Sequence, residues 1–150
     1  MKPDAAVLHA EDDRNDAFFM QLAFGEAGLA NRLFQVPNGW GVIDYLEGNP
    51  PYADRARYPF PSLLLLDLKM PGMDGFKVLE WRREHPAFAG LPTVVLSASD
   101  DAGDREQAQA LGASEYRLKP LAFSELVELV RELHERWLVP EHASVEGRNP

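Results

Sequence analysis

The sequence predicts an α/β fold, a parallel β-sheet covered by helices on both faces, and two observations and one general rule support this. Short apolar segments alternate five times with segments that carry apolar residues at helical spacing. Two of the apolar runs, LLLL at 63–66 and TVVLSA at 93–98, are continuous, as expected for central strands buried on both faces. Because crossovers between parallel strands are right-handed, the elements should assemble into a doubly wound, three-layer sandwich.

The first two strand–helix units precede residue 48. AAVLHA (5–10) indicates a buried strand, and RLFQV (32–36) indicates a second one. The helix predicted between them runs from about Asn15 to Gly28, and glycine is a favourable residue after a helix end. The residues of that helix expected to face the core are Phe18, Phe19, Leu22 and Ala23. A second helix is expected to begin at Asn38-Gly39.

A proline-rich loop, GNPPYADRARYPFP (48–61), separates these units from the rest of the chain and cannot form a regular element. It is either a tolerated surface insertion or a partner-binding loop, and both interpretations remain open from the sequence. Beyond it, the predicted strands are 63–66, 93–98 and 115–118, and the predicted helices are 76–85, 101–111 and 123–138.

The composition limits both the organisation and the function classes. The 150 residues, 45% of them hydrophobic, suit one domain, which we place at 1–138 with a disordered tail at 139–150. The chain has no cysteine, and no apolar run approaches the roughly 20 residues of a membrane helix. A net charge of −9 without a basic cluster argues against binding nucleic acid. These features favour a cytoplasmic protein without nucleic-acid or membrane partners.

Polar residues stand where four of the predicted strands end. Glu11 and Asp12 follow the first strand, Asp67 ends the third, Ser97 ends the fourth, and Lys119 follows the fifth. In a doubly wound sheet, the carboxyl ends of the strands form the edge at which ligands bind. We therefore expect these side chains to meet at one edge of the sheet.

This set of residues indicates phosphoryl chemistry. Three carboxylates at one edge repel one another unless a cation lies among them, and oxygen ligands favour Mg²⁺. Asp67 would then be an ionised carboxylate and a candidate nucleophile. Lys119, Ser97 and Mg²⁺ could together compensate the oxygens of a transferred phosphoryl group.

The chain resembles a receiver domain of the two-component response-regulator family, the CheY-like domains, over residues 5–138. The resemblance is carried by HAEDD, LLLLDLKMPGMDG, VVLSAS and YRLKP in this order. It implies a flavodoxin-like (βα)5 sandwich with the strand order 2-1-3-4-5. It also implies that Asp67 accepts a phosphoryl group from the phosphohistidine of a histidine kinase, within a phosphorelay.

The same resemblance assigns roles to the other residues. Glu11 and Asp12 would hold Mg²⁺ together with Asp67, and Lys69 would add its backbone carbonyl. Ser97 would be the switch hydroxyl, Lys119 the partner of the phosphoryl group, and Tyr116 the switch aromatic. The Lys119-Pro120 bond would be cis. Phosphorylation would change the protein contacts of the face formed by the fourth helix, the fifth strand and the fifth helix.

The long loop and the ending HERWL resemble a subgroup of stand-alone receivers whose partners are phytochrome-like or related sensor kinases. Without an output domain, the signal would pass through a downstream protein, a phosphotransfer protein or a homodimer. Such a receiver is a switch that catalyses only its own phosphorylation and dephosphorylation, and not an enzyme in the usual sense.

Two alternatives come from other classes of protein. A pseudo-receiver would act as a constitutive interaction module without phosphate, but such modules usually lose one of the acidic, hydroxyl or lysine residues, and here all are present. A small flavin-binding or hydrolytic enzyme is disfavoured because the chain lacks a glycine-rich phosphate loop after the first strand and a Gly-x-Ser-x-Gly motif.

Overall fold

A computed structural model describes residues 5–139 of the chain. Its strands are β1 (Val7–Ala10), β2 (Leu33–Val36), β3 (Leu63–Asp67), β4 (Thr93–Ser97) and β5 (Glu115–Leu118). Its α-helices are α1 (Arg14–Glu26), α2 (Gly39–Glu47), α3 (Gly75–Glu84), α4 (Ala102–Ala110) and α5 (Phe123–Leu133). Two short helical turns, η1 (Ala30–Arg32) and η2 (His134–Leu138), follow α1 and α5.

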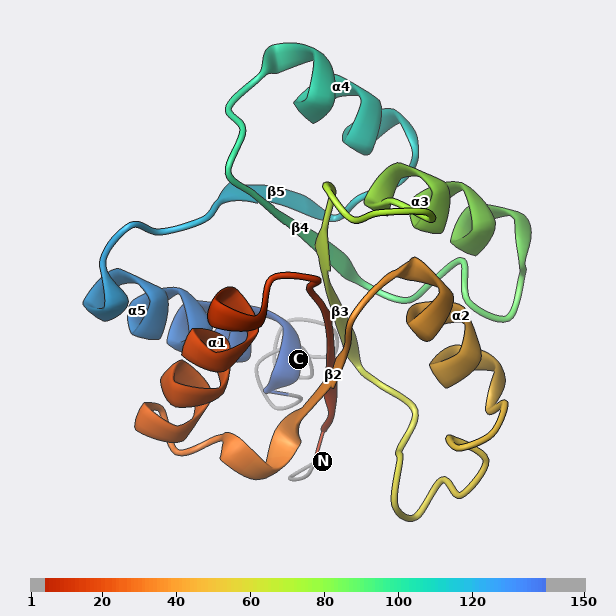
Figure 1. Ribbon diagram of the computed structural model, residues 1–150, viewed down its shortest axis with the longest axis horizontal. Coiled ribbons are helices and arrows are strands. Elements are labelled where there is room, and N and C mark those ends of the chain that lie inside the picture. The colour runs from red at the N-terminus through yellow and green to blue at the C-terminus, as the bar shows by residue number, and fades with distance from the viewer. Residues whose placement is uncertain (1–4, 140–150) are drawn as a thin grey trace, which may run out of the picture.

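The five strands form one parallel sheet in the order β2-β1-β3-β4-β5, which confirms the predicted fold class and strand order. Helices α1 and α5 cover one face of the sheet, and α2, α3 and α4 cover the other (Figure 1). None of the helices between residues 5 and 139 is long and apolar enough to cross a membrane.

The central strands owe their continuous apolar runs to burial on both faces. Every residue of β3 and β4 is buried. The side chains of β3 alternate between the two cores: Leu64 and Leu66 pack toward α2, α3 and α4, whereas Leu63 and Leu65 pack toward α1 and α5. A central strand therefore needs no polar face, and this is why its sequence does not alternate.

Helix α1 buries one of the four residues predicted to face the core, Ala23, and exposes the other three. Phe18, Phe19 and Leu22 have exposed fractions of 54%, 47% and 43%. The buried residues of the helix are Met20, Ala23 and Phe24. Two overlapping sets of apolar residues in this segment have helical spacing, and periodicity alone does not show which set packs against α5.

The C-terminal helix is shorter than the predicted 123–138. Helix α5 ends at Leu133, and the HERWL segment continues as a wider helical turn, η2, in which Leu138 is buried. The apolar periodicity continues across the junction, so the sequence pattern does not mark the change of winding. Of the predicted tail at 139–150, residues 140–150 lie outside the described part of the chain.

The proline-rich loop has no regular element, as predicted, but its side chains pack closely. Arg55 donates from Nη2 to the Leu46 carbonyl (2.8 Å) and from Nη1 to the Tyr58 carbonyl (3.2 Å). Tyr45 of α2 donates its hydroxyl hydrogen to the carbonyl of Pro59 at 2.9 Å. Tyr52 packs edge-on against Tyr58. The segment is thus a folded surface loop fixed to α2.

The peptide bond expected to be cis is trans. Among the described residues the cis bond is Pro50-Pro51, within the proline-rich loop, and Lys119-Pro120 is trans. The trans form of an X-Pro bond is intrinsically favoured by about 0.5–1 kcal/mol, so the dipeptide by itself does not determine the isomer.

Candidate functional site

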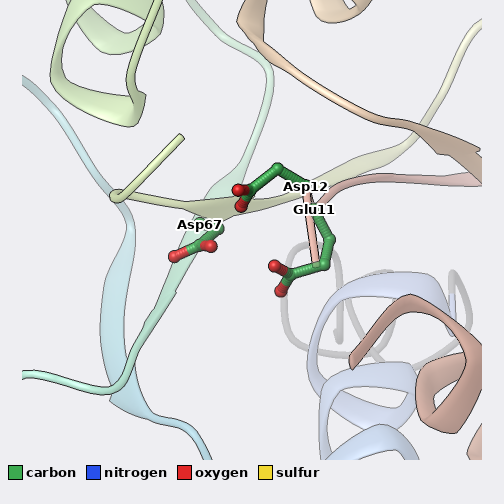
Figure 2. A group of neighbouring side chains, drawn as sticks. All are labelled: Glu11, Asp12 and Asp67. Atoms are coloured by element: carbon green, nitrogen blue, oxygen red, sulfur yellow. The ribbon is translucent and has the colours of Figure 1, made fainter. Parts of the chain in front are cut away.

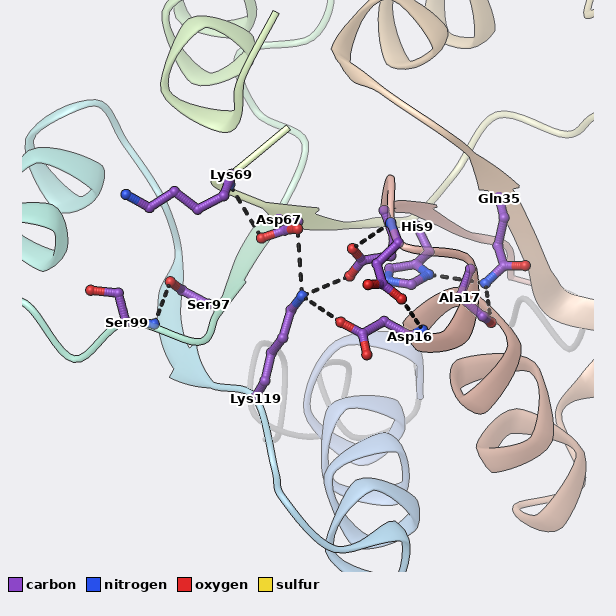
Figure 3. Close-up of polar contacts among 11 residues, drawn as sticks. His9, Asp16, Ala17, Gln35, Asp67, Lys69, Ser97, Ser99 and Lys119 are labelled. Atoms are coloured by element: carbon purple, nitrogen blue, oxygen red, sulfur yellow. Dashed lines mark hydrogen bonds and ion pairs between the residues drawn. The ribbon is translucent and has the colours of Figure 1, made fainter. Parts of the chain in front are cut away.

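Asp67, Ser97 and Lys119 lie along the carboxyl edge of the sheet (Figure 3). Asp67 and Ser97 are the last residues of the adjacent strands β3 and β4. Backbone hydrogen bonds extend the sheet by one residue at two other strands, because Glu11 N donates to the Val36 carbonyl at 3.1 Å and Lys119 N to the Ser97 carbonyl at 2.8 Å. The parallel pairing therefore brings together residues that are far apart in the sequence.

Glu11, Asp12 and Asp67 form a compact acidic group (Figure 2). One carboxylate oxygen from each residue lies within 4.8 Å of the others. Glu11 and Asp67 are buried, with exposed fractions of 5% and 4%, whereas Asp12 is exposed. An all-oxygen donor set at this spacing, open on one side, fits a hard divalent cation that keeps some of its waters.

The turn after β3 brings the backbone close to this acidic group. The Lys69 amide donates to Asp67 Oδ1 at 3.3 Å, while the Lys69 side chain extends away and its Nζ lies 3.8 Å from Asp104. Gly75, the first residue of α3, is needed there, since an added Cβ would lie 2.6 Å from the carbonyl oxygen of Asp67. Asp74 caps α3 by accepting a hydrogen bond from the Lys77 amide.

Lys119 reaches across the edge of the sheet into the acidic group. Its Nζ lies 2.9 Å from Glu11 Oε1, 3.0 Å from Asp16 Oδ2 and 3.4 Å from Asp67 Oδ2. Its side chain is only 22% exposed, so these contacts are partly shielded from water. The ammonium therefore lies beside Asp67, where it could meet a phosphoryl oxygen.

Burial and mutual charge shift the pKa values of this pair. Burial raises the pKa of Glu11 to about 7, the charge of Asp67 adds to the rise, and the Lys119 hydrogen bond opposes it. Burial also tends to lower the pKa of Lys119, but its hydrogen bonds to Glu11 and Asp16 and the charge of Asp67 raise this pKa well above its ordinary value. Lys119 is thus a permanent cation at any physiological pH.

Ser97 and Tyr116 do not contact the acidic group. Ser97 is fully buried, and its Oγ accepts a hydrogen bond from the Ser99 amide at 3.0 Å. Tyr116, in β5, is 6% exposed and donates its hydroxyl hydrogen to the Ser99 carbonyl at 2.8 Å. Both side chains thus bind the loop between β4 and α4. The Arg105 guanidinium lies 4.6 Å from the centre of the Tyr116 ring.

Two further residues shape the site. His9 is buried, and its Nδ1 accepts a hydrogen bond from Gln35 Nε2 at 3.1 Å, so its own Nε2 carries the proton. Asp16, which binds Lys119, was not predicted. The available signal was an acidic residue in the first turn of the helix that follows β1, and Asp16 is that residue.

A family model places the chain among known proteins. The model described as response regulator receiver domain matches residues 7–131. The chain belongs to this family. The match spans every strand and nearly all of α5, so the whole described sheet is that of a receiver domain.

Three solved structures resemble this receiver closely. Response regulator RPA3017, described as acting in red light signaling of R. palustris, is 34% identical with a TM-score of 0.83, over 89% of this chain and 94% of that one. The phosphorylated cyanobacterial phytochrome response regulator RcpA is 29% identical, with a TM-score of 0.80 and coverage of 91% and 95%. The Mn²⁺-bound form of Rcp1, a Synechocystis protein, is 26% identical, with a TM-score of 0.76 and coverage of 89% and 94%.

Other relatives are longer than this receiver. The chain spans half the length of the transcriptional activator IrlR of Burkholderia pseudomallei, to which it is 33% identical. The receiver fold is therefore shared with proteins that carry additional segments, whereas RPA3017, RcpA and Rcp1 are covered almost completely.

Proposed function

We propose that this receiver is a phosphorylation switch in which Asp67 accepts a phosphoryl group from the phosphohistidine of a sensor histidine kinase. The observation that carries the proposal is the meeting of Asp67 with Glu11, Asp12 and Lys119 at one edge of the sheet. The description of RcpA as phosphorylated supports it, since that protein shares the fold and 29% of the aligned residues.

In the proposed reaction an Asp67 carboxylate oxygen attacks phosphorus, the bond from phosphorus to the imidazole nitrogen breaks, and an acyl phosphate forms as the histidine leaves. Lys119 supplies an N–H donor to a phosphoryl oxygen, and the Ser97 hydroxyl supplies another once it leaves the Ser99 amide. A bound Mg²⁺ would neutralise charge on the phosphoryl oxygens. Glu11, Asp12, Asp67 and the Lys69 carbonyl would hold it, and the Mn²⁺-bound Rcp1 relative supports a divalent cation here.

The switch would act through the loop between β4 and α4. If the Ser97 hydroxyl turns toward the phosphoryl oxygens, the Ser99 amide loses its acceptor, and the same residue's carbonyl accepts from Tyr116. The two switch residues are thus joined through Ser99. A change there would alter the face made by α4, β5 and α5, through which the signal would pass to a downstream protein, a phosphotransfer protein or a second copy.

The proposed partner is a sensor kinase of the cytoplasm, related to phytochromes. The resemblance to RcpA and to RPA3017, named for phytochrome and red-light signaling, supports this class. Large apolar side chains are also exposed on α1, on the segment between β5 and α5 and at the start of α5: Phe18, Phe19, Leu22, Leu121 and Phe123. Of these, Phe19, Leu121 and Phe123 line the same cavity as Glu11, Asp16 and Lys119. A kinase that delivers phosphate to Asp67 would cover them.

Phosphorylation of the isolated protein tests the proposal. With Mg²⁺ and acetyl phosphate, wild type should gain the mass of one phosphoryl group, in a linkage stable to acid and labile to base. The gain should disappear in Asp67→Asn and when the metal is removed with a chelator. Asp74→Asn is the matched control, because asparagine caps a helix as well as aspartate does.

The outcomes separate the switch from the pseudo-receiver. No gain in wild type, or an equal gain in Asp67→Asn, would leave the constitutive interaction module as the better interpretation. Loss of the gain in Asp74→Asn would show that the assay responds to any change in the acidic turn.

A further inference from the structure

Lys119 is bound by three carboxylates, and one of them does not belong to the candidate metal group. Glu11 and Asp67 belong to that group, but Asp16 does not. We propose that Asp16 is a positioning residue that holds Lys119 at the α1 side of the site and competes with the phosphoryl group on Asp67 for its ammonium. The inference rests on the role proposed above for Lys119.

The number of N–H donors explains the competition. A lysine ammonium has three, and the three contacts of Nζ, at 2.9, 3.0 and 3.4 Å, can use all of them (Figure 3). A phosphoryl oxygen can therefore receive a donor from Lys119 only if a carboxylate gives one up. The longest of the contacts is the one to the acceptor, Asp67, so the ammonium lies closer to its other two partners.

A metal would leave Asp16 as the competing partner. A divalent cation among Glu11, Asp12 and Asp67 would draw the charge of those carboxylates toward itself. Asp16 lies in the first turn of α1, outside the acidic group, so its charge would remain directed at Lys119.

The position of Asp16 is set by the fold. Its backbone amide donates to Asp13 Oδ1 at 3.0 Å, which is the N-cap contact of α1, and α1 packs against α5. The Asp16 side chain is 47% exposed, so its replacement by asparagine should not disturb the core. The Asp16 carboxylate is therefore held in place by helix α1, and it contacts Lys119 in the loop between β5 and α5.

A titration with beryllium fluoride, a phosphoryl mimic that binds with Mg²⁺, tests the inference. Asp16→Asn should lower the half-saturating concentration on the order of 3- to 10-fold, because it removes the competing charge from Lys119. Asp13→Asn is the matched control. It removes one negative charge from the same helix turn, keeps a residue that can cap, and does not touch Lys119, so its effect should stay within about 2-fold.

Two further variants show whether Asp16 acts through Lys119. In a Lys119→Gln background, Asp16→Asn should change beryllium fluoride binding no more than Asp13→Asn does. Asp16→Glu should bind it within about 2-fold of wild type, since a glutamate can still reach the ammonium. The midpoints of thermal unfolding of Asp16→Asn and Asp13→Asn show whether either variant has lost the fold, and Asp16→Ser provides a second neutral replacement.

The outcomes distinguish this inference from the proposed function. If wild type binds beryllium fluoride and the two neutral Asp16 variants bind it equally or more weakly, the inference is wrong and the proposed function stands. An equal gain in the Lys119→Gln background also overturns it, because the effect would then be general charge repulsion. If wild type does not bind the mimic at all, the proposed function fails, and the inference fails with it.

Discussion

Tyr116 is held from both sides by residues outside its own strand. Its hydroxyl group donates to the Ser99 carbonyl, and Arg105 of α4 covers its ring at 4.6 Å. The same guanidinium donates to the Tyr116 carbonyl at 3.3 Å and to Asp100 at 3.0 Å. Through these contacts the Arg105 side chain links α4 to β5 and to the loop between β4 and α4.

The prediction for a single residue concerns Arg105. Arg105→Met keeps the length and apolar stem of the side chain but loses both hydrogen bonds and the stacked charge, so the free energy of unfolding should fall by about 1–2 kcal/mol. Urea denaturation measures the change. Arg83→Met is the control, since Arg83 makes one contact of 3.4 Å with the Ala110 carbonyl and is exposed. An equal loss in the two variants would show that Arg105 is an ordinary surface residue.

At the scale of elements, the proline-rich loop is organised around one charged side chain. Arg55 donates to two backbone carbonyls, that of Leu46 in the last turn of α2 and that of Tyr58 within the loop. Its guanidinium also lies 5.7 Å from the ring centres of Tyr45 and Phe60. These contacts hold the loop in one conformation against α2, as an unstructured insertion would not be held.

The prediction for this element is that Arg55→Met loosens the loop. Loss of two hydrogen bonds and two ring contacts should lower the unfolding free energy by about 1–3 kcal/mol and speed proteolytic cleavage within residues 48–61. Arg57→Met is the control, because Arg57 is exposed and lies over one ring, that of Tyr58, at 5.6 Å. If cleavage is unchanged in Arg55→Met, the contacts of Arg55 do not hold the loop together.

At the scale of the whole molecule, the burial of His9 ties stability to pH. Burial, assisted by the charge of Lys119, lowers the pKa of His9 to about 3. The folded protein therefore binds fewer protons than the unfolded chain, whose histidines titrate near 6.5. The stabilising contribution is complete above pH 6.5 and is lost as pH falls from there toward 3.

Wild type should thus lose unfolding free energy below pH 6.5 with a slope that includes up to about 1.4 kcal/mol per pH unit from His9. His9→Gln, which can still bond Gln35, should have a shallower slope between pH 6.5 and 4.5 in denaturation experiments. Equal slopes for wild type and His9→Gln would show that His9 does not couple folding to protons.

Most of the fold could be predicted because the relevant signals are local. The continuous apolar run at 63–66 predicts a strand buried on both faces, and β3 is such a strand. The parallel direction of the strands predicts that charged residues at their carboxyl ends lie at one edge of the sheet. The face of α1 could not be predicted, since Phe18 and Met20 both belong to stripes of helical spacing. The choice between them depends on contact with α5, more than a hundred residues away in the sequence.

The parallel sheet, its central strands and the meeting of Glu11, Asp12, Asp67 and Lys119 at one edge could be predicted from the amino-acid sequence, because strand period, apolar runs and chemical type are properties of short segments. The ion pair between Asp16 and Lys119 and the packing of Arg105 over the Tyr116 ring became visible in the three-dimensional structure alone. Both contacts join side chains from different elements at distances of a few ångströms. Such distances depend on how helices are placed on the sheet, and that placement is set by the packing of the whole core.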